Sequence, residues 1–168
     1  RTDMPLQPMT ILVLCTGNSC RSIIGEALIN ALGQGRFRGL SAGSHPTGQV
    51  NPGALAVLAR HGITAANPAS KSMDDLADED IDLIITVCDS AAGEACPVWL
   101  GDVPKLHWGL PDPAHAQGTD EEIAAAFEAT YQQLEKRLQA LFAVSLDDLN
   151  EKGLVACGEQ IHRDLEDH

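Results

Sequence analysis

The chain has no long apolar run and few basic residues. No apolar stretch approaches the ~20 residues that a membrane-spanning helix needs, so we expect no membrane span. Only 11 Lys and Arg stand against 24 Asp and Glu, which gives a formal charge of −13. Because nucleic acids favour clustered basic side chains, this balance argues against a nucleic-acid partner. It does not exclude a small anion, which a few backbone amides and one arginine can bind.

Internal repeats, low-complexity segments, nucleotide-binding glycine loops and clustered metal ligands are also missing. The first nine residues contain no apolar core of a signal peptide. Five cysteines in a chain without export features lead us to expect a cytoplasmic protein with reduced thiols. The six histidines show no mutual ligand spacing, so we expect no bound metal. A length of 168 residues with 44% apolar content predicts one soluble globular unit, and we expect a monomer.

Strand and helix patterns alternate along the chain. Short apolar segments predict strands over 10–14, 37–42, 81–87 and 105–108. Helices are expected over 22–33, from Pro52 to Gly62, and after Thr119, where a Thr-x-x-Glu capping box precedes a long periodic segment. This order predicts an α/β fold, a parallel sheet with helices on both faces that binds ligands beyond the carboxyl ends of its strands. We assign 9–144 to this domain and 145–168 to an acidic extension, helical or mobile.

The strongest functional signal lies between the first predicted strand and the first predicted helix. There a strand ends at Cys15, and Arg21 follows six positions later where a helix begins. Backbone amides and the helix dipole can hold a tetrahedral oxyanion in this loop, and the Arg21 guanidinium can bind two of its oxygens. The same positive field favours the thiolate form of Cys15. The alternative is a small buried residue at a strand end. The predicted oxyanion-binding residues are Thr16, Gly17, Asn18, Ser19, Cys20, Arg21 and Ser22.

Two further motifs follow predicted strands. Asp112 stands between two prolines, where a stiff loop can present a general acid, although Pro-Asp-Pro also suits an ordinary turn. Cys88 directly follows the 81–87 strand, and Cys96 lies eight positions further on, across a segment of small residues. That spacing is poor for zinc. It suits a redox pair if the intervening segment can rearrange, and otherwise indicates two unrelated buried cysteines.

These motifs together resemble the arsenate reductases that are built on the low-molecular-weight tyrosine phosphatase fold. The similarity runs in order from about Thr10 to Phe142, through the cysteine loop with Glu26, Thr86-Val87-Cys88 with Cys96-Pro97, and the segment from His107 to Ala114. It implies a three-layer α/β/α architecture with a four-stranded parallel sheet. It also implies the reduction of arsenate to arsenite for arsenic detoxification, without a bound cofactor.

The resemblance implies a cysteine relay as well. Cys15 attacks arsenate held by the loop and Arg21, and Asp112 protonates the leaving hydroxide. Cys88 then releases arsenite and leaves a disulfide with Cys15, after which Cys96 attacks Cys88 and forms a second disulfide. Thioredoxin, or glutaredoxin with glutathione, would supply the electrons, and phosphate or sulfate would mimic arsenate.

One departure from the family concerns a cation. Some members bind potassium near the loop, and Asn18 and Glu26 match part of that site. The segment that should add a Thr and an Asp contains Lys71 instead, within Ala69-Ser70-Lys71-Ser72. We therefore expect the Lys71 ammonium to replace the metal.

The main alternative function is a low-molecular-weight protein tyrosine phosphatase that hydrolyses phosphomonoesters through a phosphocysteine. It would share Cys15, Arg21 and Asp112 but would need neither Cys88 nor Cys96. Phosphatases of this fold usually carry aromatic residues just after the Asp-Pro, whereas this chain continues with Ala-His. A third alternative is a non-catalytic protein that binds phosphorylated or arsenic ligands.

Overall fold

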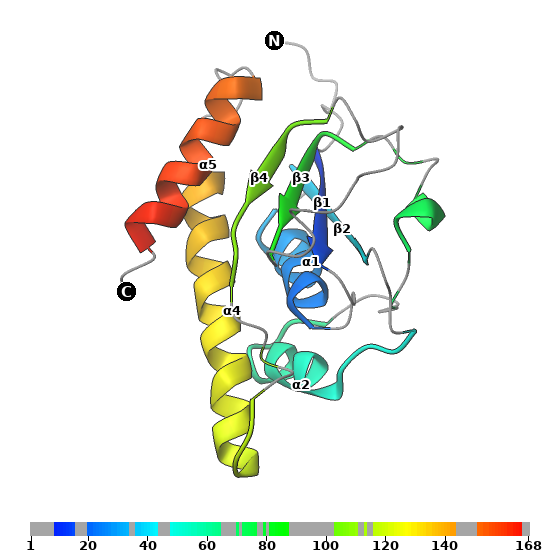
Figure 1. Ribbon diagram of the computed structural model, residues 1–168, viewed down its shortest axis with the longest axis vertical. Coiled ribbons are helices and arrows are strands. Elements are labelled where there is room, and N and C mark those ends of the chain that lie inside the picture. Colours follow the sequence, from blue (N-terminus) through cyan, green and yellow to red (C-terminus); the bar gives the residue numbers. More distant parts are fainter. Residues whose placement is uncertain are drawn as a thin grey trace.

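The computed structural model describes residues 9–15, 20–33, 36–43, 48–64, 70, 72–76, 79, 81–87, 103–110, 113, 116–143 and 151–165. Its centre is a four-stranded parallel sheet with the strand order β2-β1-β3-β4 (Figure 1). The strands are β1 (Met9–Cys15), β2 (Phe37–Gly43), β3 (Leu83–Thr86) and β4 (Lys105–His107). The predicted α/β class and the four-stranded parallel sheet are thereby confirmed.

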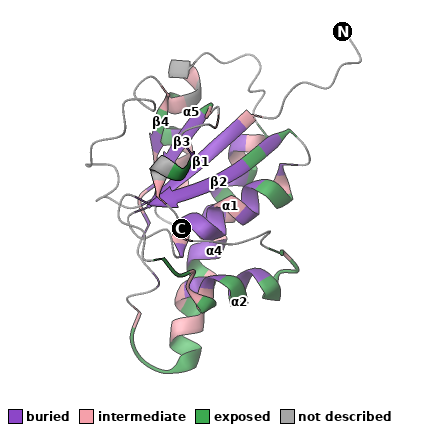
Figure 2. Ribbon diagram, turned by 90° about the vertical axis from the view of Figure 1, so that its right-hand side faces the viewer, coloured by how far each residue is buried: buried purple, intermediate pink, exposed green. Residues whose placement is uncertain are grey.

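Strand β1 lies between two neighbours and is buried on both faces. Its Val13 pairs with Ser41 of β2 on one side and with Ile85 of β3 on the other. Side chains alternate between the two faces of a strand, and here both sets are apolar. A continuous apolar run is typical of a strand in the middle of a parallel sheet, which explains why β1 could be recognised from the sequence. Figure 2 shows β1 buried along nearly its whole length.

Among the described residues, different elements cover the two faces of the sheet. Helices α1 (Arg21–Leu32), α2 (Pro52–Arg60) and α4 (Asp120–Phe142) contribute to the larger core cluster on one face. On the other face, the described residues that cover Leu12, Leu14 and Ile84 include Leu76 of the short 3₁₀ helix η1 (Met73–Leu76). Figure 1 shows η1 and the α4–α5 pair on opposite sides of the sheet.

The helix ends follow the capping signals in the sequence. Thr119 accepts from the Glu122 backbone N–H at 3.1 Å, and the Glu122 carboxylate accepts from the Thr119 N–H at 3.1 Å, so the expected capping box is present. Asn51 caps α2 by accepting from the Gly53 N–H at 2.8 Å. Gly62 follows α2 with φ of +73°, a conformation that glycine adopts at little cost.

The segment 145–168 contributes a further helix, α5 (Glu151–Leu165). Helix α5 contacts both α4 and β4, and its Ile161 packs against the larger core cluster. Arg137 of α4 is almost fully buried and donates through Nε to Nδ1 of His162 on α5, at 2.9 Å. The division of the chain at 144/145 stays a prediction. Among the described helices, none is both long and apolar enough to cross a membrane.

Candidate active site

Cys15 lies at the carboxyl end of β1, one loop before α1. Its side chain is buried, with 3% of its surface exposed, and its Sγ lies 3.0 Å from the Ser22 Oγ. Ser22 is on the first turn of α1, and its side chain is also buried. A buried hydroxyl this close to the sulfur can donate a hydrogen bond to a thiolate. The structure therefore brings together two residues that the sequence placed in one loop.

The N-terminus of α1 provides a positive environment for this sulfur. The N-cap residue, Cys20, makes no side-chain capping hydrogen bond, and the first turn contains no acidic residue. The first backbone N–H groups of a helix have no partner within the helix, and the helix dipole adds a partial positive charge there. An anion is favoured at such an end.

Arg21 connects the first turn of α1 to two other strand ends. Its Nη1 donates to the Leu110 carbonyl oxygen at 2.8 Å and lies 3.4 Å from the Val87 carbonyl oxygen. Val87 immediately follows β3, and Leu110 lies three residues beyond β4. Because the guanidinium is planar, fixing one terminal nitrogen orients the whole group. Sequence reasoning missed these two partners, because a backbone carbonyl leaves no signal in residue type.

Several predicted site residues lie outside the described residues. Two described neighbours still locate their chain segments: Val87 directly precedes Cys88, and Leu110 lies two residues before Asp112. Val87 and Leu110, the last described residues before these two positions, therefore lie beside Arg21. The roles of these side chains stay predictions, as does the role of Lys71. The residues concerned are Thr16, Gly17, Asn18, Ser19, Cys88, Cys96 and Asp112.

Beside this edge, Glu26 of α1 faces the neighbouring strand β2. Ser41 of β2 is fully buried and donates through its hydroxyl to the Glu26 carboxylate. Nearer the start of β2, the hydrogen bonds that Arg38 donates to the Glu79 carboxylate raise the pKa of Arg38, and the negative charge of Glu26 acts in the same direction. Within the described part of the chain, no group of three or more His, Cys, Asp or Glu could hold a metal ion.

The last residues of β3 and β4 are joined by a side-chain hydrogen bond. Thr86 Oγ1 lies 2.8 Å from Nδ1 of His107. The contact fixes the two strands relative to each other, one residue before Val87 and three before Leu110, the two residues that Arg21 contacts.

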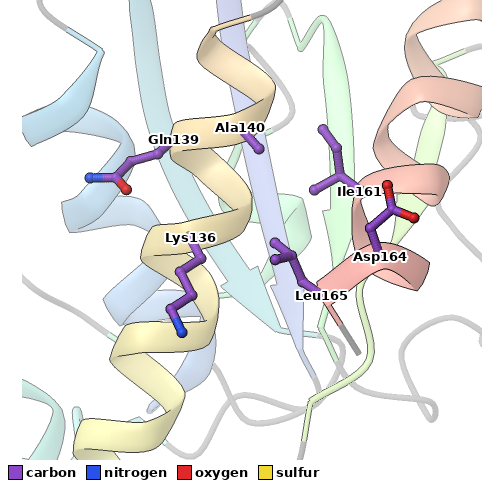
Figure 3. Close-up of a pocket in the computed structure, with 6 residues that line it drawn as sticks. All are labelled: Lys136, Gln139, Ala140, Ile161, Asp164 and Leu165. Carbon is purple, nitrogen blue, oxygen red and sulfur yellow. The ribbon is translucent and has the colours of Figure 1, made fainter. Parts of the chain in front are cut away.

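The groove that the structure shows between α4 and α5 is a separate feature. It has a volume of about 540 Å³, and Figure 3 shows Ile161 and Leu165 of α5 pointing toward α4 across it. None of its lining residues belongs to the predicted site. They are Lys136, Gln139, Ala140, Ile161, Asp164 and Leu165.

A parallel sheet with a cysteine at one strand end and an arginine on the next helical turn is the arrangement of a thiol-dependent protein that binds oxyanions. The profile of the family "Low molecular weight phosphotyrosine protein phosphatase" matches residues 10–154. The chain belongs to this family. The match ends in the first residues of α5, so most of that helix lies beyond it.

Within the family, several of the similar proteins are arsenate reductases. The chain is 37% identical to the arsenate reductase of Bacillus subtilis (strain 168) over 129 residues, which are 77% of this chain and 91% of that protein. The arsenate reductase of Archaeoglobus fulgidus superposes with a TM-score of 0.67 at 26% identity, covering 80% of this chain and 99% of its own. An arsenate reductase in its phosphate-binding state superposes with a TM-score of 0.66 at 26% identity, covering 80% of this chain and 97% of its own. The resemblance drawn from the sequence is confirmed.

Two further structures bear on the choice of activity and electron donor. A thioredoxin-dependent arsenate reductase of Corynebacterium glutamicum matches with a TM-score of 0.57 at 25% identity, covering 81% of this chain and 64% of its own. The tyrosine phosphatase amsI of Erwinia amylovora matches with a TM-score of 0.59 at 27% identity, covering 75% of this chain and 85% of its own.

Proposed function

We propose that this protein reduces arsenate to arsenite through a relay of cysteine thiols, with thioredoxin as the electron donor. The observation that carries the proposal is the position of Arg21, whose guanidinium bridges the Val87 and Leu110 carbonyls beside the Cys15–Ser22 pair. The chain continues from Val87 into Cys88 and from Leu110 toward Asp112. This arrangement supports one reaction centre to which the segments after β1, β3 and β4 contribute residues.

The chemistry begins with the thiolate of Cys15. Its sulfur attacks arsenic, and a hydroxide leaves as water after it takes a proton from Asp112. Cys88 then attacks the Cys15 sulfur, so that a disulfide forms and the sulfur–arsenic electron pair stays on arsenic. Arsenic thus gains two electrons, and arsenite departs. Attack of Cys96 on Cys88 returns Cys15 to its thiol and moves the oxidation to the Cys88–Cys96 pair.

A dithiol protein completes the cycle by reducing the Cys88–Cys96 disulfide. The thioredoxin-dependent relative of C. glutamicum supports thioredoxin over glutaredoxin with glutathione. Such a cycle runs where thiols are kept reduced, which is consistent with action in the cytoplasm. The proposed biological role is arsenic detoxification.

Phosphomonoester hydrolysis is the second candidate, since the family profile and the E. amylovora phosphatase share this fold. It needs Cys15, Arg21 and Asp112 but leaves Cys88 and Cys96 without a role. The B. subtilis relative, which is 37% identical to this chain, is an arsenate reductase, and this supports the reductase activity.

The test is arsenate-dependent oxidation of NADPH, coupled either to thioredoxin and its reductase or to glutathione and glutaredoxin. We expect turnover with thioredoxin for the native protein and none for Cys15→Ser, Cys88→Ser or Cys96→Ser. Turnover that survives in Cys96→Ser with glutathione would contradict the thioredoxin donor. Absence of NADPH oxidation with either donor, together with fast hydrolysis of a phosphotyrosine peptide, would establish the phosphatase instead.

A further inference from the structure

Helix α5 makes an unusually close contact with the last strand of the sheet. Gly158 of α5 is buried and lies against the Leu106 side chain of β4, so closely that a Cβ at position 158 would overlap it. Leu106 itself is fully buried. The approach therefore requires glycine at position 158 and fixes the distance between α5 and β4.

A hydrogen bond at the same place connects α5 to the residue that follows β4. The Trp108 indole Nε1 donates to the Gly158 carbonyl oxygen at 2.9 Å, and the Trp108 side chain is fully buried. A buried indole N–H needs an acceptor, and α5 supplies it. The ring of Trp108 is therefore fixed both by packing and by a directional bond.

Trp108 is separated by one residue from the carbonyl that orients Arg21. Its backbone N–H donates to the Thr86 carbonyl oxygen at 2.7 Å, and the Leu110 N–H donates to the Val87 carbonyl oxygen at 3.0 Å. The Leu110 carbonyl oxygen in turn accepts from Arg21 Nη1. A displacement of Trp108 consequently moves the acceptor that sets the plane of the guanidinium.

We propose that α5 is a positioning element of the active site, which acts through the Trp108–Gly158 contact and the Leu110 carbonyl on Arg21. Trp108 is the positioning residue, because it touches α5 on one side and continues into the Leu110 segment on the other. Gly158 and most of α5 lie beyond the family match, so the α5 side of this contact belongs to the part of the chain that extends the shared fold. It rests on the proposed function only in that Arg21 binds an oxyanion, and a phosphatase would bind one in the same way.

Phosphate is the probe that tests the proposal independently of arsenate turnover. We would measure the Kd for phosphate by calorimetry on the reduced full-length protein, together with its Tm, for Trp108→Phe and Gly158→Ala. Trp108→Phe keeps an aromatic ring and removes the N–H, and Gly158→Ala forces α5 away from Leu106. Small displacements of positioned groups have large effects, so we expect Kd to rise by about tenfold in both. The KM for arsenate should rise with it while kcat changes less.

Gly33→Ala serves as the matched control. A Cβ there would lie 2.7 Å from the Phe37 carbonyl oxygen, at the sheet edge opposite the carboxyl ends of the strands. It should lower Tm and leave the Kd for phosphate within about twofold. Adding Leu106→Val to Gly158→Ala makes room for the new methyl group and should recover phosphate binding.

Two results would overturn the proposal. One is a lowered Tm with unchanged Kd in Trp108→Phe and Gly158→Ala, which would make α5 a purely structural addition. The other is a Kd that rises equally in Gly33→Ala, which would mean that any loss of stability weakens binding. Failure of the native protein to bind phosphate would instead count against the oxyanion site itself. Lost arsenate reduction with intact phosphate binding would count only against the reductase activity.

Discussion

At the residue scale, the reactivity of Cys15 depends in part on a neighbouring hydroxyl. Ser22 Oγ lies 3.0 Å from the sulfur, and both side chains are buried, so water does not compete for this contact. A hydrogen bond to a charged group contributes about 1.5–3 kcal/mol, twice the value for a neutral pair. Ser22 is therefore expected to stabilise the thiolate more than the thiol.

Ser22→Ala should lower kcat/KM for arsenate by about tenfold to a hundredfold at neutral pH, because the thiolate loses this donor. The rate of iodoacetamide alkylation at neutral pH measures the same effect without turnover, with Cys15→Ser to identify the modified residue. The kcat/KM of Ser22→Thr, which keeps a hydroxyl, should lie between the values for the native protein and for Ser22→Ala. An alkylation rate that stays at the native value while kcat/KM falls would show that Ser22 does not act through the Cys15 sulfur.

Only some contacts of these site residues could be predicted from the sequence. Cys15, Arg21 and Ser22 were predictable as neighbours, because one strand end and one helical turn bring them together. The contacts of Arg21 with Val87 and Leu110 join segments 66 and 89 residues away along the chain. They involve backbone oxygens, which every residue carries, so only the assembled sheet reveals them.

At the scale of elements, α2 and α4 are joined by a small group of ring and carboxylate contacts. The His61 ring stacks on Tyr131 with centroids 3.9 Å apart, and its Nε2 lies 2.9 Å from Glu128 Oε2. A hydrogen bond from Gln132, with a further one from His61, lowers the pKa of Glu128. Burial, together with the nearby Glu135 carboxylate, raises the pKa of Tyr131 to about 12. This interface therefore favours an ionised Glu128 and a neutral Tyr131.

The sign of the Tyr131 effect predicts an alkaline loss of stability. Because the folded-state pKa is raised from 10.0 to about 12, the contribution is complete below pH 10 and is lost as the pH rises toward 12. Tyr131 is the only tyrosine, so absorbance at about 295 nm reports it alone. We expect a midpoint near 12 in buffer and near 10 in concentrated urea.

The control for this prediction is Tyr131→Phe, which keeps the ring but cannot ionise. Urea unfolding of this variant should lose less stability between pH 10 and 12 than the native protein does. A midpoint near 10 in the folded native protein would show that Tyr131 is solvated and that the α2–α4 interface is looser than described.

The elements differ in how well the sequence predicts them. Capping residues act locally, so the starts of α2 and α4 at Asn51 and Thr119 follow directly from residue type. The packing of α5 does not, since Gly158 in a helix would ordinarily be read as a weak position. Its purpose depends on Leu106, 52 residues earlier in the chain, and becomes visible only when the two lie together.

At the scale of the whole molecule, the fold follows from one strand. The apolar run 11–14 requires burial on both faces, and a strand–helix order then leaves a parallel sheet as the solution. Which described elements cover each face was not predictable, because that depends on which connection carries each helix. The charge of −13 leaves the fold unchanged but adds self-repulsion to the folded state.

The net charge and the replacement of potassium by Lys71 lead to separate predictions about how NaCl and KCl change Tm. Raising NaCl from ~0.01 M to ~0.15 M should raise Tm, because it screens the repulsion among acidic groups. If the Lys71 ammonium takes the place of potassium beside Glu26, KCl at the same ionic strength should raise Tm as much as NaCl does. Lys71→Ala should then gain a rise specific to potassium, since binding to the folded state alone stabilises it. Lys136→Ala, which removes a positive charge elsewhere, should show none. A potassium-specific rise in the native protein, measured by thermal scans in the two salts, would contradict the replacement and indicate a metal beside the cysteine loop.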